Sequence, residues 1–260
     1  MQIKIIGQHY TKQRTDDMKI IINADDFGYS NGVNYGIIDA YKNGILTSTT
    51  CLTNGYGFTH AIQLAKENTK LGVGVHLTLT SGKPLTGNLS SLTDSSGKFK
   101  NISHYENKFY IDTKELYIEW KTQIEKFLST GLKPTHLDSH HHVNNLPNIK
   151  PVFLQLATEY NLPVRNNLGR SENYPGIKMV DYFERQPETI LKATQEFKND
   201  YKSYETIEIM CHPAYIDKIL RDSSSFVTPR IEELDILTSK HAKNTFTVKN
   251  GFSLINYSNL

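Results

Sequence analysis

The stretch Lys19-Ile-Ile-Ile-Asn-Ala-Asp-Asp26 decides the fold class, because a short and almost wholly apolar run ends in two acidic residues. Such a run is typical of a parallel strand that is covered on both faces. From Lys19 onward, short β-rich runs alternate with helical patterns, as in successive βα units. The sequence therefore predicts one α/β domain over residues 18–260, a distorted or incomplete parallel β/α barrel of about seven strands.

Hydrophobic periodicity and cap signals place the individual elements of this domain. Residues 1–17 are expected to be an N-terminal extension, and the Gly-, Ser-, Thr- and Asn-rich stretch 80–113 is expected to be a lid or a substrate-facing insertion after the third strand. Residues 166–188 are expected to be irregular. Strands are predicted at 20–24, 45–52, 71–79, 135–139, 162–165, 207–211 and 245–248, and helices at 31–43, 58–66, 116–128, 151–160, near 187–198 and at 229–242.

Composition narrows the classes of partner and the compartment. The chain has 260 residues, and its 29 basic and 27 acidic side chains give a net charge of +2, too small a field to favour nucleic acid or an anionic membrane. No apolar run approaches the ~20 residues of a membrane span. Cys51 and Cys211 both lie in apolar runs, so they indicate neither a disulfide framework nor a cysteine zinc site. We therefore expect a cytoplasmic protein with a small-molecule partner.

Acidic and imidazole side chains gather where the predicted strands end. Asp25-Asp26 follows the first strand, His76 lies late in the third, His140–His142 follows the fourth and His212 follows the sixth. Ligands of parallel α/β folds bind at this edge of the sheet. One carboxylate and two imidazoles bind a divalent ion while leaving positions open for water and substrate. We predict Asp26, His76 and His140 as the metal ligands; zinc, cobalt, manganese and magnesium all remain candidates.

The remaining polar groups at this edge complete a hydrolytic set. Asp25 is the candidate general base, and His212 is the candidate acid that protonates a departing amine. Candidate substrate-binding residues are Phe27, Tyr29 and Tyr215, which could stack on sugars, together with Arg165, for a sugar hydroxyl or a phosphate, and His142. Each residue also has an ordinary structural explanation: aspartates form turns, a lone strand histidine packs in a core, and aromatic residues fill cores.

Five segments lie along the chain in a distinctive order, and they cover it from about Met18 to the C-terminus. They are Asn23-Ala-Asp-Asp-Phe-Gly28, Gly44-Ile-Leu-Thr-Ser-Thr-Thr50, Gly74-Val-His-Leu77, Lys133-Pro-Thr-His-Leu-Asp-Ser-His-His-His142 and Met210-Cys-His-Pro-Ala214. Together they resemble the YdjC-like carbohydrate deacetylases, most closely the chitooligosaccharide deacetylases of that family. One departure is Asn144, which stands where the pattern would have a further histidine.

The resemblance implies a distorted β/α barrel that binds a divalent cation, usually described as magnesium. It implies hydrolysis of N-acetyl groups on chitobiose-type sugars to acetate and free amine, in the catabolism of chitin-derived sugars. It places the ligand histidines at His76 and His140, with Asp26 joining them, Asp25 as the base and His212 as the acid. The expected partner is an N-acetylglucosamine oligosaccharide, and a homodimer is left open.

Two other hypotheses use the same residues. One is a metal-dependent hydrolase of another bond, such as a phosphoester or a cyclic amide. The other is a sugar-binding or metal-sensing module without activity, although the intact set of Asp and His side chains argues against it. Acetate release from short chitooligosaccharides separates these hypotheses from a deacetylase.

Overall fold

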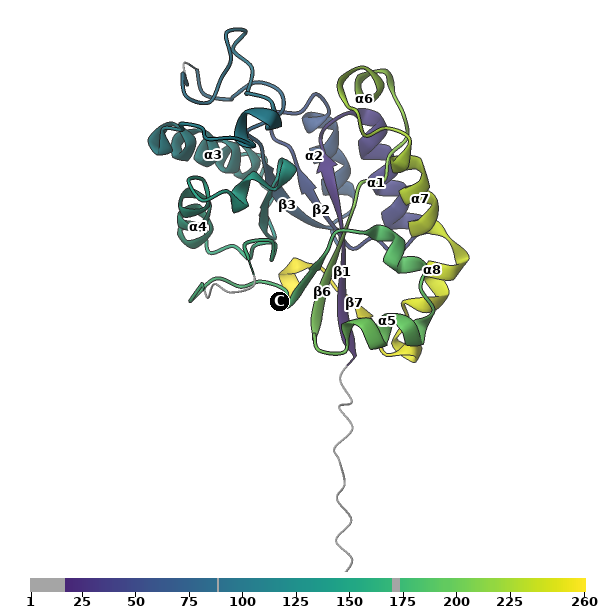
Figure 1. Ribbon diagram of the computed structural model, residues 1–260. Coiled ribbons are helices and arrows are strands. Elements are labelled where there is room, and N and C mark those ends of the chain that lie inside the picture. Colours follow the sequence, from purple (N-terminus) through teal and green to yellow (C-terminus); the bar gives the residue numbers. More distant parts are fainter. Residues whose placement is uncertain (1–16, 88, 170–173) are drawn as a thin grey trace, which may run out of the picture.

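The computed structural model describes residues 17–87, 89–169 and 174–260, so most of the predicted extension at 1–17 lies outside the described residues. Its seven strands form a single parallel sheet in the order β4-β3-β2-β1-β6-β5, with β7 paired to the start of β1 (Figure 1). The sheet curls without closing, which confirms the predicted incomplete barrel. The strands are β1 (Met18–Phe27), β2 (Ser48–Cys51), β3 (Gly72–Leu77), β4 (Leu137–Ser139), β5 (Tyr182–Glu184), β6 (Thr206–Cys211) and β7 (Phe252–Leu254).

Helices flank the curled sheet, with α3 and α4 beside the β3–β4 edge and α1 against α2 and α7 (Figure 1). The α-helices are α1 (Asn31–Asn43), α2 (Phe58–Glu67), α3 (Thr113–Leu128), α4 (Lys150–Glu159), α5 (Thr194–Tyr201), α6 (Lys218–Ser223), α7 (Pro229–Thr238) and α8 (Lys240–Thr245). The 3-10 turns are η1 (Ile102–Tyr105), η2 (His140–Asn145), η3 (Pro187–Leu191), η4 (Val248–Asn250) and η5 (Tyr257–Asn259). Within the described ranges, none of these helices has the length and apolar content needed to cross a bilayer.

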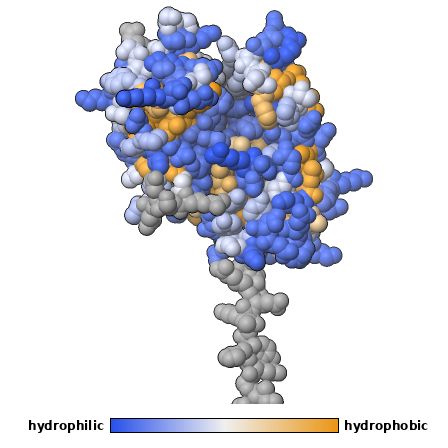
Figure 2. Space-filling model, in the orientation of Figure 1, coloured by the Kyte–Doolittle hydropathy of each residue, from blue (hydrophilic) through white to orange (hydrophobic). Residues whose placement is uncertain are grey.

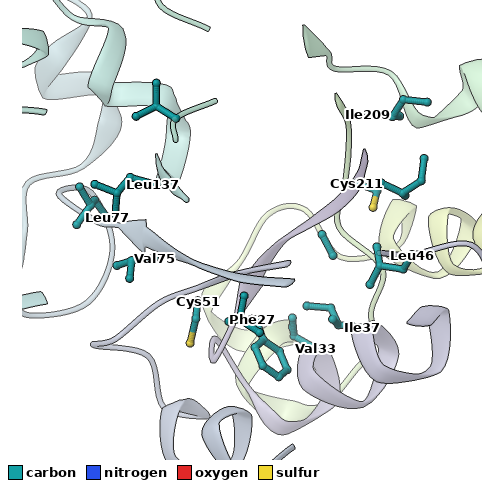
Figure 3. Packing of buried hydrophobic residues seen from close by; sticks show 14 of the residues in the cluster. Phe27, Val33, Ile37, Leu46, Cys51, Val75, Leu77, Leu137, Ile209 and Cys211 are labelled. Carbon is teal, nitrogen blue, oxygen red and sulfur yellow. The ribbon is translucent and has the colours of Figure 1, made fainter. Parts of the chain in front are cut away.

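The core lies between the outer face of the sheet and its helices. The ring of Phe27, at the end of β1, points toward Val33 and Ile37 of α1, and all three side chains are fully buried (Figure 3). On the other side of the molecule, Trp120 of α3 packs against Phe153 of α4 with ring centroids 6.3 Å apart. Burial of each such side chain stabilises the fold by about 1.5–3 kcal/mol, so this layer holds the strand ends in fixed positions.

Helix α1 lies unusually close to the segment that follows β6. The Ser30 hydroxyl accepts a hydrogen bond from the Val33 amide and caps the helix, as predicted. A Cβ atom at Gly36 would lie 2.4 Å from the Cα of Ala214, so only glycine permits this approach. The close packing fixes the backbone directly after His212.

Two of the predicted strands are wrong in extent or position. The segment 162–165 forms only single bridges, from Val164 to Leu137 and to Met179. Residues 245–248 end α8 and begin η4, and the last strand is Phe252–Leu254, after a left-handed turn at Gly251 with φ 75°. Weak alternation in short segments explains both errors, because pairing partners rather than local sequence decide such strands.

Three further boundaries differ from the predictions. The predicted helix 229–242 is divided at Ser239, whose extended backbone ends α7 and whose hydroxyl accepts from the Ala242 amide to cap α8. The predicted helix near 187–198 is likewise divided into η3 and α5 by extended backbone at Lys192 and Ala193. The stretch 166–188, predicted to be irregular, contains β5.

The predicted insertion is held onto α3 by two carboxylates, those of the buried Glu119 and the half-buried Glu115. Glu119 of α3 accepts hydrogen bonds from the Leu85 and Thr86 amides, at 3.0 and 2.9 Å, and Glu115 accepts one from the Ser91 amide at 2.8 Å. These backbone amides of the insertion therefore donate to carboxylates on α3 and not to a neighbouring strand.

Candidate active site

A bulge in β1 directs the side chains of two consecutive aspartates toward the same cavity. Neighbouring strand residues normally point to opposite faces, but the register of β1 with β2 shifts between Ala24 and Phe27, and Asp26 has a φ of 72°. A bulge of this kind redirects side chains. As a result, Asp25 Oδ2 lies 3.9 Å and Asp26 Oδ1 lies 3.6 Å from the same atom, His76 Nε2.

The three predicted metal ligands converge in this cavity. His140 Nδ1 lies 3.0 Å from Asp26 Oδ1, and one ligand atom each from Asp26, His76 and His140 fall within 4.8 Å of one another. Asp26 Oδ1 is buried, and its contact with His140 does not have the geometry of a hydrogen bond, which leaves this oxygen without a hydrogen-bond partner. A buried carboxylate oxygen between two imidazole nitrogens is a donor set that suits a divalent cation, so these residues fit such an ion.

Asp138, which is not among the predicted site residues, orients His76. The two residues are cross-strand partners on β3 and β4, and His76 Nδ1 lies 2.7 Å from Asp138 Oδ1. The Thr50 hydroxyl donates to the same oxygen at 2.6 Å. Because Nδ1 faces the carboxylate, Nε2 is directed toward Asp26. Burial alone would lower the pKa of His76, but the charges of Asp138 and Asp25 raise it to about 9.

Arg230 of α7, also not predicted, holds the other oxygen of Asp26. Its Nη2 donates to Asp26 Oδ2 at 2.6 Å, and both side chains are almost fully buried. Burial would raise the pKa of Asp26, but His140 and Arg230 together lower it well below its usual range. The carboxylate is therefore ionised, with Oδ1 directed at the histidines.

Asp25 is held by a buried arginine. Arg165 Nη1 and Nη2 donate to the two oxygens of Asp25 at 2.8 and 2.6 Å, and Arg165 also contacts Glu208 at 2.8 Å and Asp138 at 3.0 Å. Against the effect of burial, Arg165 lowers the pKa of Asp25. The Arg165 side chain, expected to bind a sugar hydroxyl or a phosphate, is completely buried among these three carboxylates, which require its charge.

His212 lies across the cavity from the metal ligands. Its Nε2 is 4.0 Å from Asp25 Oδ2, and its Nδ1 is 3.7 Å from Glu233 Oε2. The His212 amide also donates to the Glu233 carboxylate. This side chain is 21% exposed, whereas that of Asp25 is 3% exposed, so His212 can reach a bound molecule from the solvent side.

These groups line a cavity of about 560 Å³. It opens as a hydrophilic notch between the insertion and the segment around α6 (Figure 2). Thr80, Ser81, Asn101 and Ile102 of the insertion form part of its wall, so this segment does face the cavity. Phe226 is an aromatic residue of the wall, and its ring lies 5.4 Å from that of His212.

Two of the five predicted substrate-binding residues line this cavity, namely Tyr29 and His142. Phe27 packs wholly in the core beside α1 (Figure 3). Tyr215 points away, since its hydroxyl donates to Asp39. The bulge in β1 turns Phe27 inward, and Arg165 is buried beneath the cavity residue Asp25, so neither side chain lines the cavity. Asn144, which stands at the departure from the family pattern, is buried and donates to Asn167 Oδ1.

The fold and this site define an α/β half-barrel protein with a buried carboxylate and imidazole centre at the carboxyl ends of its strands. The sequence model of the family described as YdjC-like protein matches residues 19–247. The chain belongs to the YdjC-like family, which confirms the resemblance.

Named relatives and a solved structure agree with this family. A protein named carbohydrate deacetylase from Clostridium beijerinckii is 41% identical over 94% of this chain and 100% of its own length. Another with that name, from Halalkalibacterium halodurans, is 45% identical over 85% of this chain and 95% of its own. A crystal structure from Enterococcus faecalis, of a protein whose proposed activity is cellobiose-phosphate cleavage, has a TM-score of 0.84 and 38% identity over 94% of this chain and 99% of that one.

Proposed function

We propose that the protein is a metal-dependent carbohydrate deacetylase that removes N-acetyl groups from chitooligosaccharides. The observation that carries this proposal is the joint placement of Asp26, His76 and His140 beside an acid and base pair in a 560 Å³ cavity. Family membership and the relatives named carbohydrate deacetylase support the reaction class. The chitooligosaccharide substrate rests on the sequence motifs.

Asp26, His76 and His140 would hold the divalent cation. When bound, such a cation polarises an acetamide carbonyl and stabilises the negative charge that develops on its oxygen. Magnesium follows from the family resemblance, whereas two imidazole ligands also suit zinc and other transition metals. Asp138 and Arg230 would keep the ligand atoms aligned, because each binds the far side of one ligand.

Asp25 and His212 would divide the proton transfers between them. Asp25 takes a proton from water as the water oxygen bonds to the acetyl carbon, and Arg165 keeps this carboxylate ionised and oriented. His212 donates a proton to the nitrogen as the carbon–nitrogen bond breaks, which gives acetate and the free amine. Asp25 Oδ2 and His212 Nε2 are 4.0 Å apart, so they face the same reacting group.

Acetate release from diacetylchitobiose tests the proposal. The protein is first treated with a chelator and then assayed with magnesium, manganese, cobalt and zinc in turn. We expect activity to return with at least one cation and to fall about 10²- to 10⁴-fold in Asp25→Asn, as when a general base is lost. Asp222→Asn, an exposed carboxylate on α6, serves as the control.

Two outcomes contradict the proposal. Activity that is unaffected by the chelator would show that the reaction does not require a metal ion. Absence of acetate with every cation, together with cleavage of a phosphorylated cellobiose, would favour the activity proposed for the Enterococcus faecalis protein.

A further inference from the structure

The C-terminal turn η5 lies at the end of the half-barrel opposite the active site. The Asn256 side chain donates to the Lys70 carbonyl, just before β3 begins at Gly72. The other end of the same amide caps the turn, because its oxygen accepts from the Ser258 amide at 2.9 Å. In Figure 1 the turn is the yellow segment beside the C-terminal mark. The last residues of the chain therefore lie at the amino ends of the strands, whereas Asp25 lies near a carboxyl end.

Tyr257 of this turn points into the barrel. Its side chain is 1% exposed, and its ring stacks on that of His136 with centroids 3.9 Å apart. Gly74 of β3 leaves room for His136, since a Cβ atom there would lie 2.5 Å from the imidazole. Ile21 and Val180 also pack against the tyrosine. These contacts fix the direction of the Tyr257 hydroxyl.

The hydroxyl of Tyr257 binds a buried carboxylate inside the barrel, that of Glu208. It donates to Glu208 Oε2, while Oε1 accepts from Arg165 Nε and Nη2 at 2.9 and 2.8 Å. Burial raises the pKa of Glu208, and both Arg165 and the Tyr257 hydrogen bond oppose that rise. Both oxygens of Glu208 are thus occupied, and Tyr257 favours the charged form that holds Arg165.

Glu208 and Asp25 hold two different edges of the Arg165 guanidinium. Glu208 binds the edge formed by Nε and Nη2, and Asp25 binds the edge formed by Nη1 and Nη2. A planar guanidinium that is held on two edges cannot turn without breaking hydrogen bonds. The position of Glu208 therefore sets the angle at which Arg165 meets Asp25. Asp25 Oδ2, which accepts from Nη1, is also the atom that lies 4.0 Å from His212 Nε2.

We propose that Tyr257 is a positioning residue for the reaction. Through Glu208 and Arg165, it fixes the carboxylate of the candidate base from the opposite end of the barrel. The inference rests on the proposed function for the role of Asp25. Tyr257 does not line the active-site cavity, so its hydroxyl acts on the rate of the chemical step and not on the binding of substrate or cation.

The test removes the hydroxyl and keeps the ring. In the metal-loaded protein, Tyr257→Phe should lower kcat for diacetylchitobiose about tenfold and leave KM and cation affinity within about twofold. Tyr201→Phe is the matched control, because Tyr201 is also buried and its hydroxyl donates to a carboxylate, Glu184 Oε2, at 2.6 Å. Neither Tyr201 nor Glu184 lines the cavity. The control should shift the urea midpoint of unfolding by a similar amount and leave kcat unchanged. Equal losses of kcat in the two variants, or an unchanged kcat in Tyr257→Phe, would overturn the inference.

A spectroscopic measurement keeps this inference separate from the proposed function. In protein labelled with ¹⁵N-arginine, the Nε–H signal of Arg165 reports its bond to Glu208 whether or not acetate is released. We expect this signal to move and to exchange faster with water in Tyr257→Phe, and to stay in place in Tyr201→Phe. A signal that is unchanged in Tyr257→Phe contradicts the positioning role even in an active deacetylase. If the parent releases no acetate, the proposed function fails, while a displaced signal still supports the hold of Tyr257 on Arg165.

Discussion

Replacing Asp138 with asparagine tests how the candidate metal centre is held. The Asp138 carboxylate is fully buried, and its Oδ1 lies 2.7 Å from His76 Nδ1. The same oxygen accepts a hydrogen bond from the Thr50 hydroxyl. Asp138→Asn keeps the size of the side chain but removes the negative charge that fixes the imidazole tautomer. Loss of such an outer partner lowers metal affinity about 10- to 100-fold, or about 1.4–2.7 kcal/mol.

The affinity is measured by competition between the protein and a fluorescent chelator for zinc or manganese. Thr50→Val is the matched control, because it removes one hydrogen bond to the same oxygen and leaves the charge in place; a loss of ~threefold at most is expected. His76→Ala provides the reference for a missing ligand. An Asp138→Asn protein that binds the cation as tightly as its parent would refute the proposed role of this carboxylate.

Two further predictions concern stability. Gly36→Ala places a Cβ atom 2.4 Å from the Ala214 backbone, so urea unfolding should show a loss of about 1–3 kcal/mol, whereas Gly87→Ala, with nothing within 4 Å, should be nearly neutral. Burial lowers the pKa of His136 to about 4, from 6.5 when unfolded. The neutral His136 imidazole makes its full contribution to the free energy of unfolding above pH 6.5. As the pH falls from 6.5 toward 4, protonation of this residue in the unfolded chain lowers that free energy by about 3 kcal/mol. His136→Phe should lose less stability than the parent between pH 7 and 4.5, and equal losses would contradict this pKa.

The strand ends of the site could be predicted because they depend on local pattern. In β3, alternation separates His76 from Val75 and Leu77, and the apolar run of β1 marks where Asp25 must lie. Parallel connectivity then brings these ends to one edge without further information. The convergence of Asp26, His76 and His140 follows from this rule alone.

The partners of these residues could not be predicted in the same way. Arg230 meets Asp26 across 204 positions of sequence, and no periodicity links the two. Arg165 follows a weak strand signal and resembles a surface cation until its three buried carboxylate partners are known. Alternation in 135–139 could have indicated Asp138, since this residue shares a strand face with His136. The bulge that buries Phe27 depends on pairing with β2 and leaves no local signature.

The two cysteines report on the strand that supports the site. Cys51 and Cys211 are register partners of β1 on opposite sides, facing Phe27 and Ala24 respectively, and both thiols are fully buried. Burial raises the pKa of each thiol, which further slows its reaction with alkylating reagents in the folded protein. The rate of alkylation, followed by mass spectrometry, would therefore report how often the central strand opens transiently. The same measurement with substrate added would show whether occupancy of the cavity suppresses those openings.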